Sequence, residues 1–323
     1  MQSQTLAIET MGLSKHFGQH RAVDTLDLAI HQGSIFGFLG PNGAGKTTTI
    51  RMLLGLIRPT SGGGRILGYD IMRDSAAILP HIGAIVESPA FYPYLSGRDN
   101  LRALGRTAGN EDMYRIAGVL DQVGLADRAR DKVRTYSLGM KQRLAIAAAL
   151  LSEPQIIFLD EPTNGLDPAG TVEIRELIRQ LGASGHTIFI SSHLLHEVEQ
   201  MCTEVAIINH GKMVTQGRVT SLLKQDTALL IKAEPLSIVQ GVSSHFGVSP
   251  QVVGPRAVTV ALPPEQTPEL MTALISAGAR VYQITPQHSS LEQLFLDLTD
   301  EAHNGHQAGE QSASSVAVAT ERK

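Results

Sequence analysis

The chain has 323 residues, of which 42% are apolar and 18% charged, and its formal net charge is −4. This length favours two domains, and the charge balance excludes a general attraction to nucleic acid or to an anionic membrane. The one cysteine, Cys202, excludes a disulfide framework and fits a reducing cytosol. The N-terminal residues lack the features of a signal peptide, and the longest apolar run, at about 144–151, is far shorter than the roughly 20 residues that span a bilayer. We therefore expect any action at a membrane to pass through a partner.

The first part of the chain predicts antiparallel strands. The expected strands cover residues 6–11, 22–30 and 34–39. A turn at 15–19 separates the first two, and Gln32-Gly33 closes a hairpin before the third. Phe17 lies in the predicted turn, ahead of Gly40. An aromatic ring at this place either stacks on a nucleobase or packs in the core, and its spacing favours neither interpretation.

Residues 40–48 read GPNGAGKTT and match the pattern G-x-x-x-x-G-K-[ST] of a phosphate-binding loop. Glycines let backbone N–H groups converge on phosphate oxygens, Lys46 reaches the β- and γ-phosphates, and the Thr47 hydroxyl can bind Mg²⁺. A buried strand before the loop and a helix at 46–56 after it argue against a chance glycine-rich turn. The expected nucleotide-binding residues are Gly40, Pro41, Asn42, Gly43, Ala44, Gly45, Lys46, Thr47 and Thr48.

The chain after this loop predicts an α/β core that a helical insert interrupts. A breaker cluster at 58–64 precedes short strands at 65–67 and 82–86. The insert, about residues 88–150, has helical patterns at 99–107, 112–123 and 140–151. The core resumes with strands and helices at 155–160, 167–181, 187–191 and 193–201, and a closing hairpin at 204–216. This alternation predicts a mainly parallel sheet covered on both faces, with Asp167 as the N-cap of a helix.

A second, smaller α+β unit is expected over residues 226–300, after a first domain at 1–225. Its strand-like segments are 228–232, 251–253, 258–262 and 281–285, and its helix-like segments are 235–246, 268–277 and 290–300. The order β-α-β-β-α-β suggests a ferredoxin-like sandwich with an added terminal helix. The composition of residues 301–323 predicts a disordered tail.

Two carboxylates supply what a phosphate loop lacks for hydrolysis. Asp160 and Glu161 end an apolar strand, and the carboxyl ends of parallel strands share one edge of a sheet. We expect Asp160 to hold Mg²⁺ through a water and Glu161 to polarise the water that attacks the γ-phosphate. His193 follows the strand at 187–191, so it can bridge the γ-phosphate and Glu161. The alternatives are a helix-capping pair of carboxylates and a capping or surface histidine.

With these motifs in place, residues 5–225 resemble the ATP-binding subunit of ABC transporters, a P-loop NTPase fold. The resemblance rests on GPNGAGKT, on YSLGMKQRL at 136–144, on IIFLDEPTNGLDP at 156–168 and on His193. It implies a dimer in which two cassettes close head to tail around two ATP molecules. Ser137 and Gly139 would then contact the γ-phosphate across the dimer, Asp167 would lie at the seam, and Phe17 would stack on adenine.

Two departures from the usual family pattern indicate which branch of the family the chain resembles. Leu138 and Met140 stand where the common LSGGQ signature has glycine and glutamine, and Glu87 stands where the family has a glutamine and is expected near Mg²⁺. In both departures the chain resembles one branch of the family, the ATPases of bacitracin-resistance and lantibiotic-immunity exporters. Those ATPases pair with a separate membrane protein and have a small C-terminal domain with a motif like SLEQLF at 290–295.

The resemblance implies an ATP-hydrolysing motor subunit of an exporter for a peptide antibiotic, a drug or a lipid-like molecule. The chain would lie peripherally on the cytoplasmic face of the membrane, with a separate permease docked near residues 87–96. Exposed aromatics there, Phe91, Tyr92 and Tyr94, would contact the permease or pack on the insert. The competing functions are a soluble ABC-type ATPase acting on ribosome or DNA and a nucleotide-binding regulator without a transport role. A single phosphate loop, no sustained heptads and no basic stripe argue against the ribosome or DNA.

Overall fold

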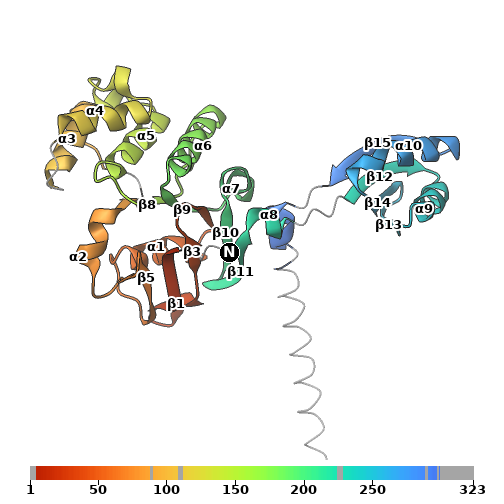
Figure 1. The fold of residues 1–323 in the computed structure, drawn as a ribbon, viewed down its shortest axis with the longest axis horizontal. Coiled ribbons are helices and arrows are strands. Elements are labelled where there is room, and N and C mark those ends of the chain that lie inside the picture. Colours follow the sequence, from red (N-terminus) through yellow and green to blue (C-terminus); the bar gives the residue numbers. More distant parts are fainter. Residues whose placement is uncertain are drawn as a thin grey trace, which may run out of the picture. The chain divides into compact units, whose positions relative to one another are not determined.

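The computed structural model describes residues 5–87, 90–107, 112–223, 228–287, 290–296 and 298 (Figure 1). The chain divides into two compact units, residues 1–219 and 220–323. The short helix α8 (Val219–Leu222) lies at this division. The boundary therefore comes slightly before the one expected after residue 225. The predicted tail at 301–323 lies outside the described residues.

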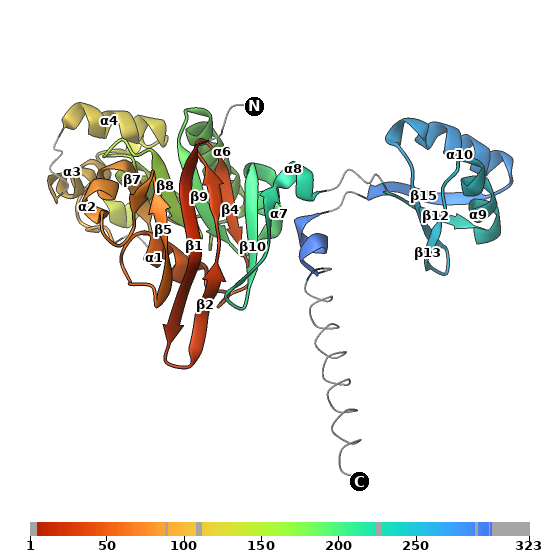
Figure 2. The same ribbon diagram turned by 60° about the horizontal axis from the view of Figure 1, so that its bottom comes forward.

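An antiparallel sheet opens the first unit. Its strands are β1 (Leu6–Phe17), β2 (His20–Leu26), β3 (Ala29–His31), β5 (Ser61–Ile66) and β6 (Tyr69–Asp70). Their order is β2-β1-β5-β6, and β3 also pairs with β1; Figure 2 shows β1 and β2 in red as long paired strands. The turn predicted at 15–19 is wrong in its first half, because β1 continues through Phe17. The predicted strand at 22–30 is interrupted, since β2 and β3 pair with β1 at separate places.

Glycines in β5 pack backbone against backbone rather than breaking the strand. A Cβ at Gly62 would lie 2.0 Å from the carbonyl oxygen of Gly12, and one at Gly64 would lie 2.8 Å from that of Glu9. The breaker cluster predicted at 58–64 is therefore wrong from Ser61 onward, because these residues form the strand that pairs with β1.

A six-stranded sheet forms the centre of the first unit. Its strands are β4 (Ile35–Leu39), β7 (Ile82–Ile85), β8 (Ile156–Asp160), β9 (Thr187–Ser192), β10 (Glu204–Asn209) and β11 (Lys212–Arg218), in the order β11-β10-β4-β9-β8-β7. All neighbours are parallel except β10 and β11, which confirms the mainly parallel sheet and its closing hairpin. The hairpin predicted at Gln32-Gly33 is wrong, because β3 and β4 belong to different sheets.

Both faces of the central sheet are covered, and every residue of β4, β8 and β9 is buried. The helices of the α/β core are α1 (Lys46–Leu53), α2 (Ser75–Ile78), α6 (Pro168–Ala183) and α7 (Leu195–Met201). Within the sheet, the Phe189 ring lies 5.3–5.6 Å, centroid to centroid, from the rings of Phe36, Phe38 and Phe158. This packed aromatic cluster holds β4, β8 and β9, whose carboxyl ends carry the candidate site.

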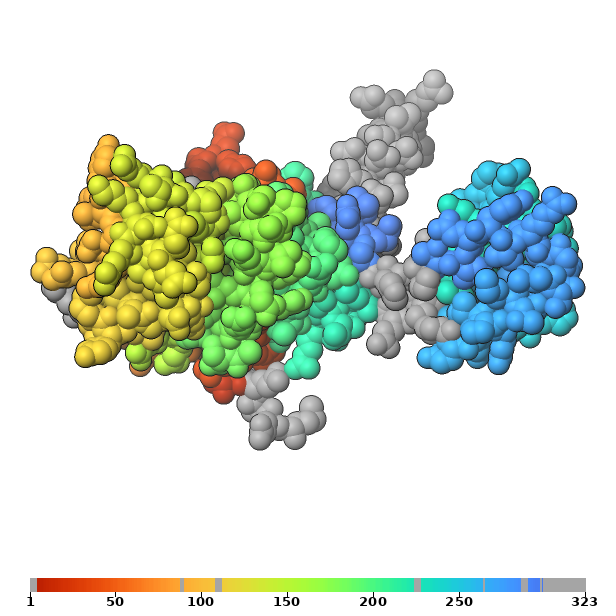
Figure 3. Space-filling view, turned by 90° about the horizontal axis from the view of Figure 1, so that it is seen from above, coloured from red at the N-terminus to blue at the C-terminus, as the bar shows by residue number. Residues whose placement is uncertain are grey.

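The three helices expected in the insert are present as α3 (Gly97–Thr107), α4 (Met113–Gln122) and α5 (Leu138–Ala149). Short 3₁₀ turns at Ala126–Arg128 and Val133–Thr135 join α4 to α5. Figure 3 shows the yellow residues of the insert meeting the green residues of α6 without a break on that face.

The second unit has the elements β12 (Ala228–Glu234), α9 (Leu236–His245), β13 (Gln251–Gly254), β14 (Ala257–Ala261), α10 (Thr267–Ser276) and β15 (Arg280–Gln287). The strands form an antiparallel sheet in the order β13-β14-β12-β15, and the elements follow the β-α-β-β-α-β order of ferredoxin-like folds. Its core includes Leu229, Ile231, Val258, Leu270 and Leu274. Residues 291–296 are helical. Across the described part of the chain, no helix is both long and apolar enough to cross a membrane.

Candidate functional site

The loop at 40–48 joins β4 to α1, and its glycines are required by both conformation and space. Gly43 and Gly45 have φ values of 82° and 105°, in the region that favours glycine. A Cβ at Gly45 would lie 2.4 Å from the carbonyl oxygen of Ala22, and one at Gly40 would lie 2.4 Å from that of Ile208. Backbone carbonyl oxygens of neighbouring segments therefore lie too close to the loop for a side chain at these positions. With glycine there, the N–H groups of the loop can converge on an anion at the start of α1.

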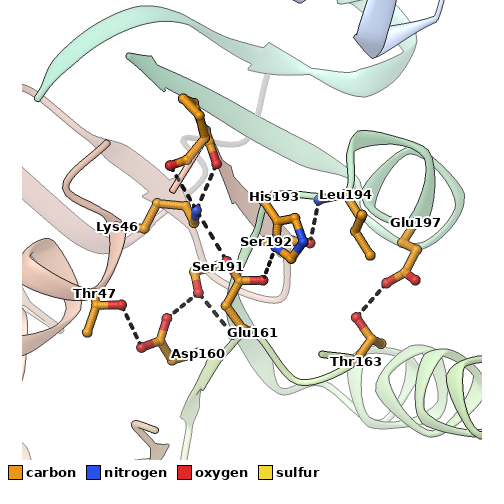
Figure 4. Close-up of polar contacts among 12 residues, drawn as sticks. Lys46, Thr47, Asp160, Glu161, Thr163, Ser191, Ser192, His193, Leu194 and Glu197 are labelled. Carbon is orange, nitrogen blue, oxygen red and sulfur yellow. Dashed lines mark hydrogen bonds and ion pairs between the residues drawn. The ribbon is translucent and has the colours of Figure 1, made fainter. Parts of the chain in front are cut away.

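Lys46 is the first residue of α1, and its ammonium group is held inside the loop. The side chain is only 6% exposed, and Nζ donates hydrogen bonds to the carbonyl oxygens of Gly40 (2.7 Å) and Pro41 (3.3 Å). Nζ also lies 3.2 Å from Oε1 of Glu161 (Figure 4). A nearly buried cation with three oxygen partners is thus fixed where phosphate oxygens would meet the loop.

Asp160 and Thr47 bring two oxygen ligands together from segments far apart in the sequence. Thr47 Oγ1 donates to Oδ2 of Asp160 at 2.9 Å, and the Ser191 hydroxyl donates to the other carboxylate oxygen. Parallel pairing of β8 with β9, and of β9 with β4, produces this meeting at one sheet edge, as expected. A hydroxyl and a carboxylate are ligands that suit Mg²⁺, which completes its shell with water and phosphate oxygens.

Glu161 links the lysine of the loop to the histidine after β9. Its Oε2 lies 2.7 Å from Nδ1 of His193, while its Oε1 faces Lys46 (Figure 4). Its backbone N–H donates to the carbonyl oxygen (3.2 Å) and the hydroxyl (3.0 Å) of Ser191. The carboxylate is 21% exposed, so it is accessible to a water molecule while two partners fix its direction. This arrangement suits a group that orients a water for attack on a phosphate.

Lys46, Thr47, Glu161 and His193 line a pocket of about 460 Å³ that Phe17 also lines. The Phe17 ring, at the end of β1, is 52% exposed, so the interpretation as a core residue is wrong. Nζ of Lys15 lies 5.1 Å from the ring centroid, a cation–π geometry. His20 and Asn164 also line the pocket and were missed from the sequence. His20 is the cross-strand partner of Phe17, a relation that only the hairpin register reveals.

Three further residues expected at the site lie outside this pocket. The exposed Ser137 accepts a hydrogen bond from the backbone N–H of Met140 (3.2 Å) and caps α5; Asp167 accepts one from Gly170 (3.0 Å) and caps α6, as predicted. Neither of them, nor Gly139, is among the described residues that line the pocket of the same chain. Their place in a nucleotide site therefore stays a prediction that needs a second copy.

The altered signature segment lies against the turn that follows Glu161. The Leu138 side chain is 52% exposed, and a Cβ at Gly165 would lie 3.4 Å from its Cδ2 atom. The segment therefore presents an apolar group where the common signature has glycine.

Glu87 pairs with Arg51 on α1, one helical turn after Thr47. Its side chain is 64% exposed, and its φ is 67°. The structure thus directs this carboxylate to an arginine rather than to the pair formed by Thr47 and Asp160. Binding of Mg²⁺ by Glu87 stays a prediction.

An apolar groove of about 410 Å³ lies beside the insert, lined by residues of β7 and α5 and by Phe91 and Leu104. Tyr92 and Tyr94 are 64% and 75% exposed, as expected. The expectation of an exposed Phe91 is wrong, because its ring is half-buried and lines this groove. Residues 88 and 89 of the expected docking segment lie outside the described residues.

Fold and site together define a P-loop nucleotide-binding protein: a mainly parallel sheet with a phosphate loop after β4 and two carboxylates at the carboxyl end of β8. Residues 23–164 match the family model described as ABC transporter. The bacitracin transport ATP-binding protein BcrA of Bacillus licheniformis is 42% identical over 296 residues, which cover 90% of this chain and 96% of that protein. The daunorubicin/doxorubicin resistance ATP-binding protein DrrA of Streptomyces peucetius is 35% identical over 329 residues, 97% of each chain.

A solved structure described as the ATP-binding subunit of an ABC transporter matches with a TM-score of 0.63 at 24% identity, covering 91% of this chain and all of that one. At this identity the match supports the fold. The sequence relatives establish the rest: the chain belongs to the ABC transporter ATP-binding proteins. Members of this family bind ATP and hydrolyse it to power transport, and they work with membrane permease partners.

Proposed function

We propose that this chain is the ATP-hydrolysing motor subunit of an exporter. The observation that carries the proposal is Glu161, whose carboxylate bridges Lys46 and His193 in the lining of the pocket. The loop N–H groups and Lys46 would hold the β- and γ-phosphates, and Glu161 would orient the attacking water. Thr47 and Asp160 would hold Mg²⁺, which neutralises phosphate charge when bound. His193 would keep Glu161 directed at that water.

A head-to-tail dimer accounts for the signature residues that lie outside the pocket. Ser137 and Asp167 are exposed N-caps of α5 and α6, and the N-terminal end of a helix favours negative charge. Neither is among the described residues that line the pocket around the phosphate loop of its own chain, whereas a second copy would bring its own loop to them. Gly139, just after the Ser137 cap, would let the phosphate approach the backbone closely.

The groove beside β7 and the exposed Tyr92 and Tyr94 favour a docking surface for a separate permease. Aromatic side chains next to an apolar groove are typical anchors of protein interfaces. The chain would then lie peripherally on the cytoplasmic face of the membrane. The named relatives act in bacitracin transport and in daunorubicin/doxorubicin resistance, which supports a peptide antibiotic, a drug or a lipid-like molecule as the cargo.

The catalytic part is tested with Glu161→Gln, which keeps the size of the side chain and removes its charge. We expect hydrolysis to fall by at least about 100-fold, with ATP affinity retained and the ATP-bound dimer stabilised. Phosphate release, nucleotide titration and light scattering measure the three effects. Glu176→Gln, an exposed glutamate on α6, is the matched control. Unchanged turnover in Glu161→Gln would overturn the assignment.

The docking part is tested by co-purification with the membrane protein encoded beside this chain. Replacing both Tyr92 and Tyr94 with alanine should abolish the complex and leave ATP binding intact. Tyr114, 91% exposed on α4, offers a matched control as Tyr114→Ala. Equal loss of the complex in the double variant and in Tyr114→Ala would show that the docking surface does not lie at Tyr92 and Tyr94. Survival of cells carrying both proteins in bacitracin or daunorubicin would then separate the cargo classes.

A further inference from the structure

A second side-chain hydrogen bond joins the turn that carries Glu161 to α7, the helix that follows His193. Thr163 Oγ1 donates to Oε2 of Glu197 at 2.5 Å, parallel to the contact between His193 and Glu161 (Figure 4). Thr163 is only 5% exposed, and Glu197 lies in the first turn of α7, four residues after His193. Two side-chain contacts therefore connect the turn after β8 with the segment formed by His193 and α7.

The turn after β8 holds its backbone in an unfavourable conformation at Glu161. Glu161 has a φ of 49°, which is uncommon for a residue with a side chain, and the following Pro162 restricts it further. Such a conformation persists only where its surroundings enforce it. Ser191 binds the backbone of Glu161 at the start of the turn, and the N–H of Asn164 donates to the Glu161 carbonyl at 3.1 Å. Thr163 is the member of the turn whose side chain reaches α7.

On the other side of the contact, α7 is a short helix that depends on tertiary contacts. It spans seven residues and has no side-chain N-cap. A helix of this length is not stable alone. Val198 anchors it in the core, where a Cβ at Gly37 would lie 2.3 Å from the Val198 Cγ1 atom. The bond from Thr163 to Glu197 holds the end of α7 nearest His193, whereas Arg175 and Arg179 donate to Gln200 near its other end.

We propose that Thr163 and Glu197 are positioning residues for ATP hydrolysis: their hydrogen bond fixes α7 to the turn after β8 and thereby holds His193 against Glu161. This inference rests on the proposed role of Glu161. Without the bond, Glu161 and Lys46 still meet at the phosphate loop, so ATP binds. The carboxylate then loses its fixed direction toward the water, because His193 moves with α7. The effect should therefore fall on turnover and not on nucleotide affinity.

The test compares an isosteric loss of the hydroxyl with its conservative replacement in the full-length protein. Thr163→Val should lower kcat for ATP about tenfold, the effect of one hydrogen bond to a charged group, with KM and the Kd for ATP unchanged within about twofold. Thr163→Ser keeps the donor and should retain most of the turnover. Glu197→Leu should match Thr163→Val, and the double variant should lose no more than either single one.

Hydrogen exchange gives a readout that does not depend on turnover. Amides of residues 194–202 should exchange faster in Thr163→Val than in Thr163→Ser, at an unchanged midpoint of global unfolding. Full turnover and unchanged exchange in Thr163→Val would overturn the proposal, as would equal losses in the valine and serine variants. If Glu161→Gln abolishes hydrolysis while Thr163→Val is active, only the positioning role fails. If Glu161→Gln is fully active, the proposed function fails first.

Discussion

Truncation of Phe17 offers a sharp test of how the pocket recognises the base. The ring is 52% exposed beside the phosphate loop, and Lys15 lies 5.1 Å from its centroid. Stacking of a base on an aromatic ring contributes about 1–3 kcal/mol, so Phe17→Ala should raise the Kd for ATP about 5- to 150-fold. Because roughly half of the ring is already in water, the free energy of unfolding should fall by only about 1 kcal/mol.

Equilibrium titrations with ATP and with inorganic tripolyphosphate separate the base from the phosphates. Phe17→Ala should weaken ATP and leave tripolyphosphate binding unchanged, because Lys46 and the loop glycines are untouched. Phe17→Tyr keeps the ring and should bind ATP within about twofold of the parent chain. Equal weakening of both ligands would mean that Phe17 shapes the loop rather than contacting the base. Unchanged ATP affinity would refute stacking altogether.

Three further predictions concern the expected metal ligands, two glycines and the buried cysteine. Thr47→Ala or Asp160→Asn should raise the Mg²⁺ concentration for half-maximal hydrolysis about 10- to 100-fold at saturating ATP; an unchanged requirement would remove both from the metal site. Gly83→Ala should lower the free energy of unfolding by about 1–3 kcal/mol, since its Cβ would lie 2.2 Å from a backbone carbonyl oxygen of α5. Gly118→Ala, whose Cβ would meet no described atom within 4 Å beyond its own helix backbone and chain neighbours, should instead raise it by about 0.5–1 kcal/mol; equal denaturation midpoints would contradict this pair. Burial raises the pKa of the Cys202 thiol, so the native thiol stays protonated at pH 8 and should react with a thiol reagent only after denaturation. The pKa of the thiol in the unfolded chain is about 8.5, so the free energy of unfolding should fall as pH rises above that value. Rapid labelling of the native protein by the thiol reagent would contradict the burial of Cys202.

Local pattern was sufficient for the parts of the site that are contiguous in the chain. The phosphate loop is specified by residues within one short segment, so its match needs no knowledge of distant partners. The same holds for the N-cap at Asp167, where the side chain binds the backbone of Gly170 in its own first turn. The strands that end at Asp160 and at Ser192 were also recognisable, because fully buried strands are continuous apolar runs.

Errors arose where a partner far along the chain decides the local structure. Lys15 to Phe17 read as a turn, yet pairing with β2 extends β1 through Phe17. Gly62 and Gly64 read as breakers, although their missing side chains let β5 approach β1. In both cases a residue's own propensity was overruled by a backbone contact that the sequence does not display.

The sequence by itself determined which chemical groups are present: a phosphate loop, a hydroxyl and a carboxylate of the kinds that suit Mg²⁺, a second carboxylate and a histidine, in the order of an ABC ATP-binding protein. Only the tertiary structure decided how these groups meet. It placed Glu161 between Lys46 and His193, turned Glu87 toward Arg51, and exposed the ring of Phe17 at the pocket. The physical reason is that residue type sets which bonds a group can form, whereas strand order and register set which groups come within reach.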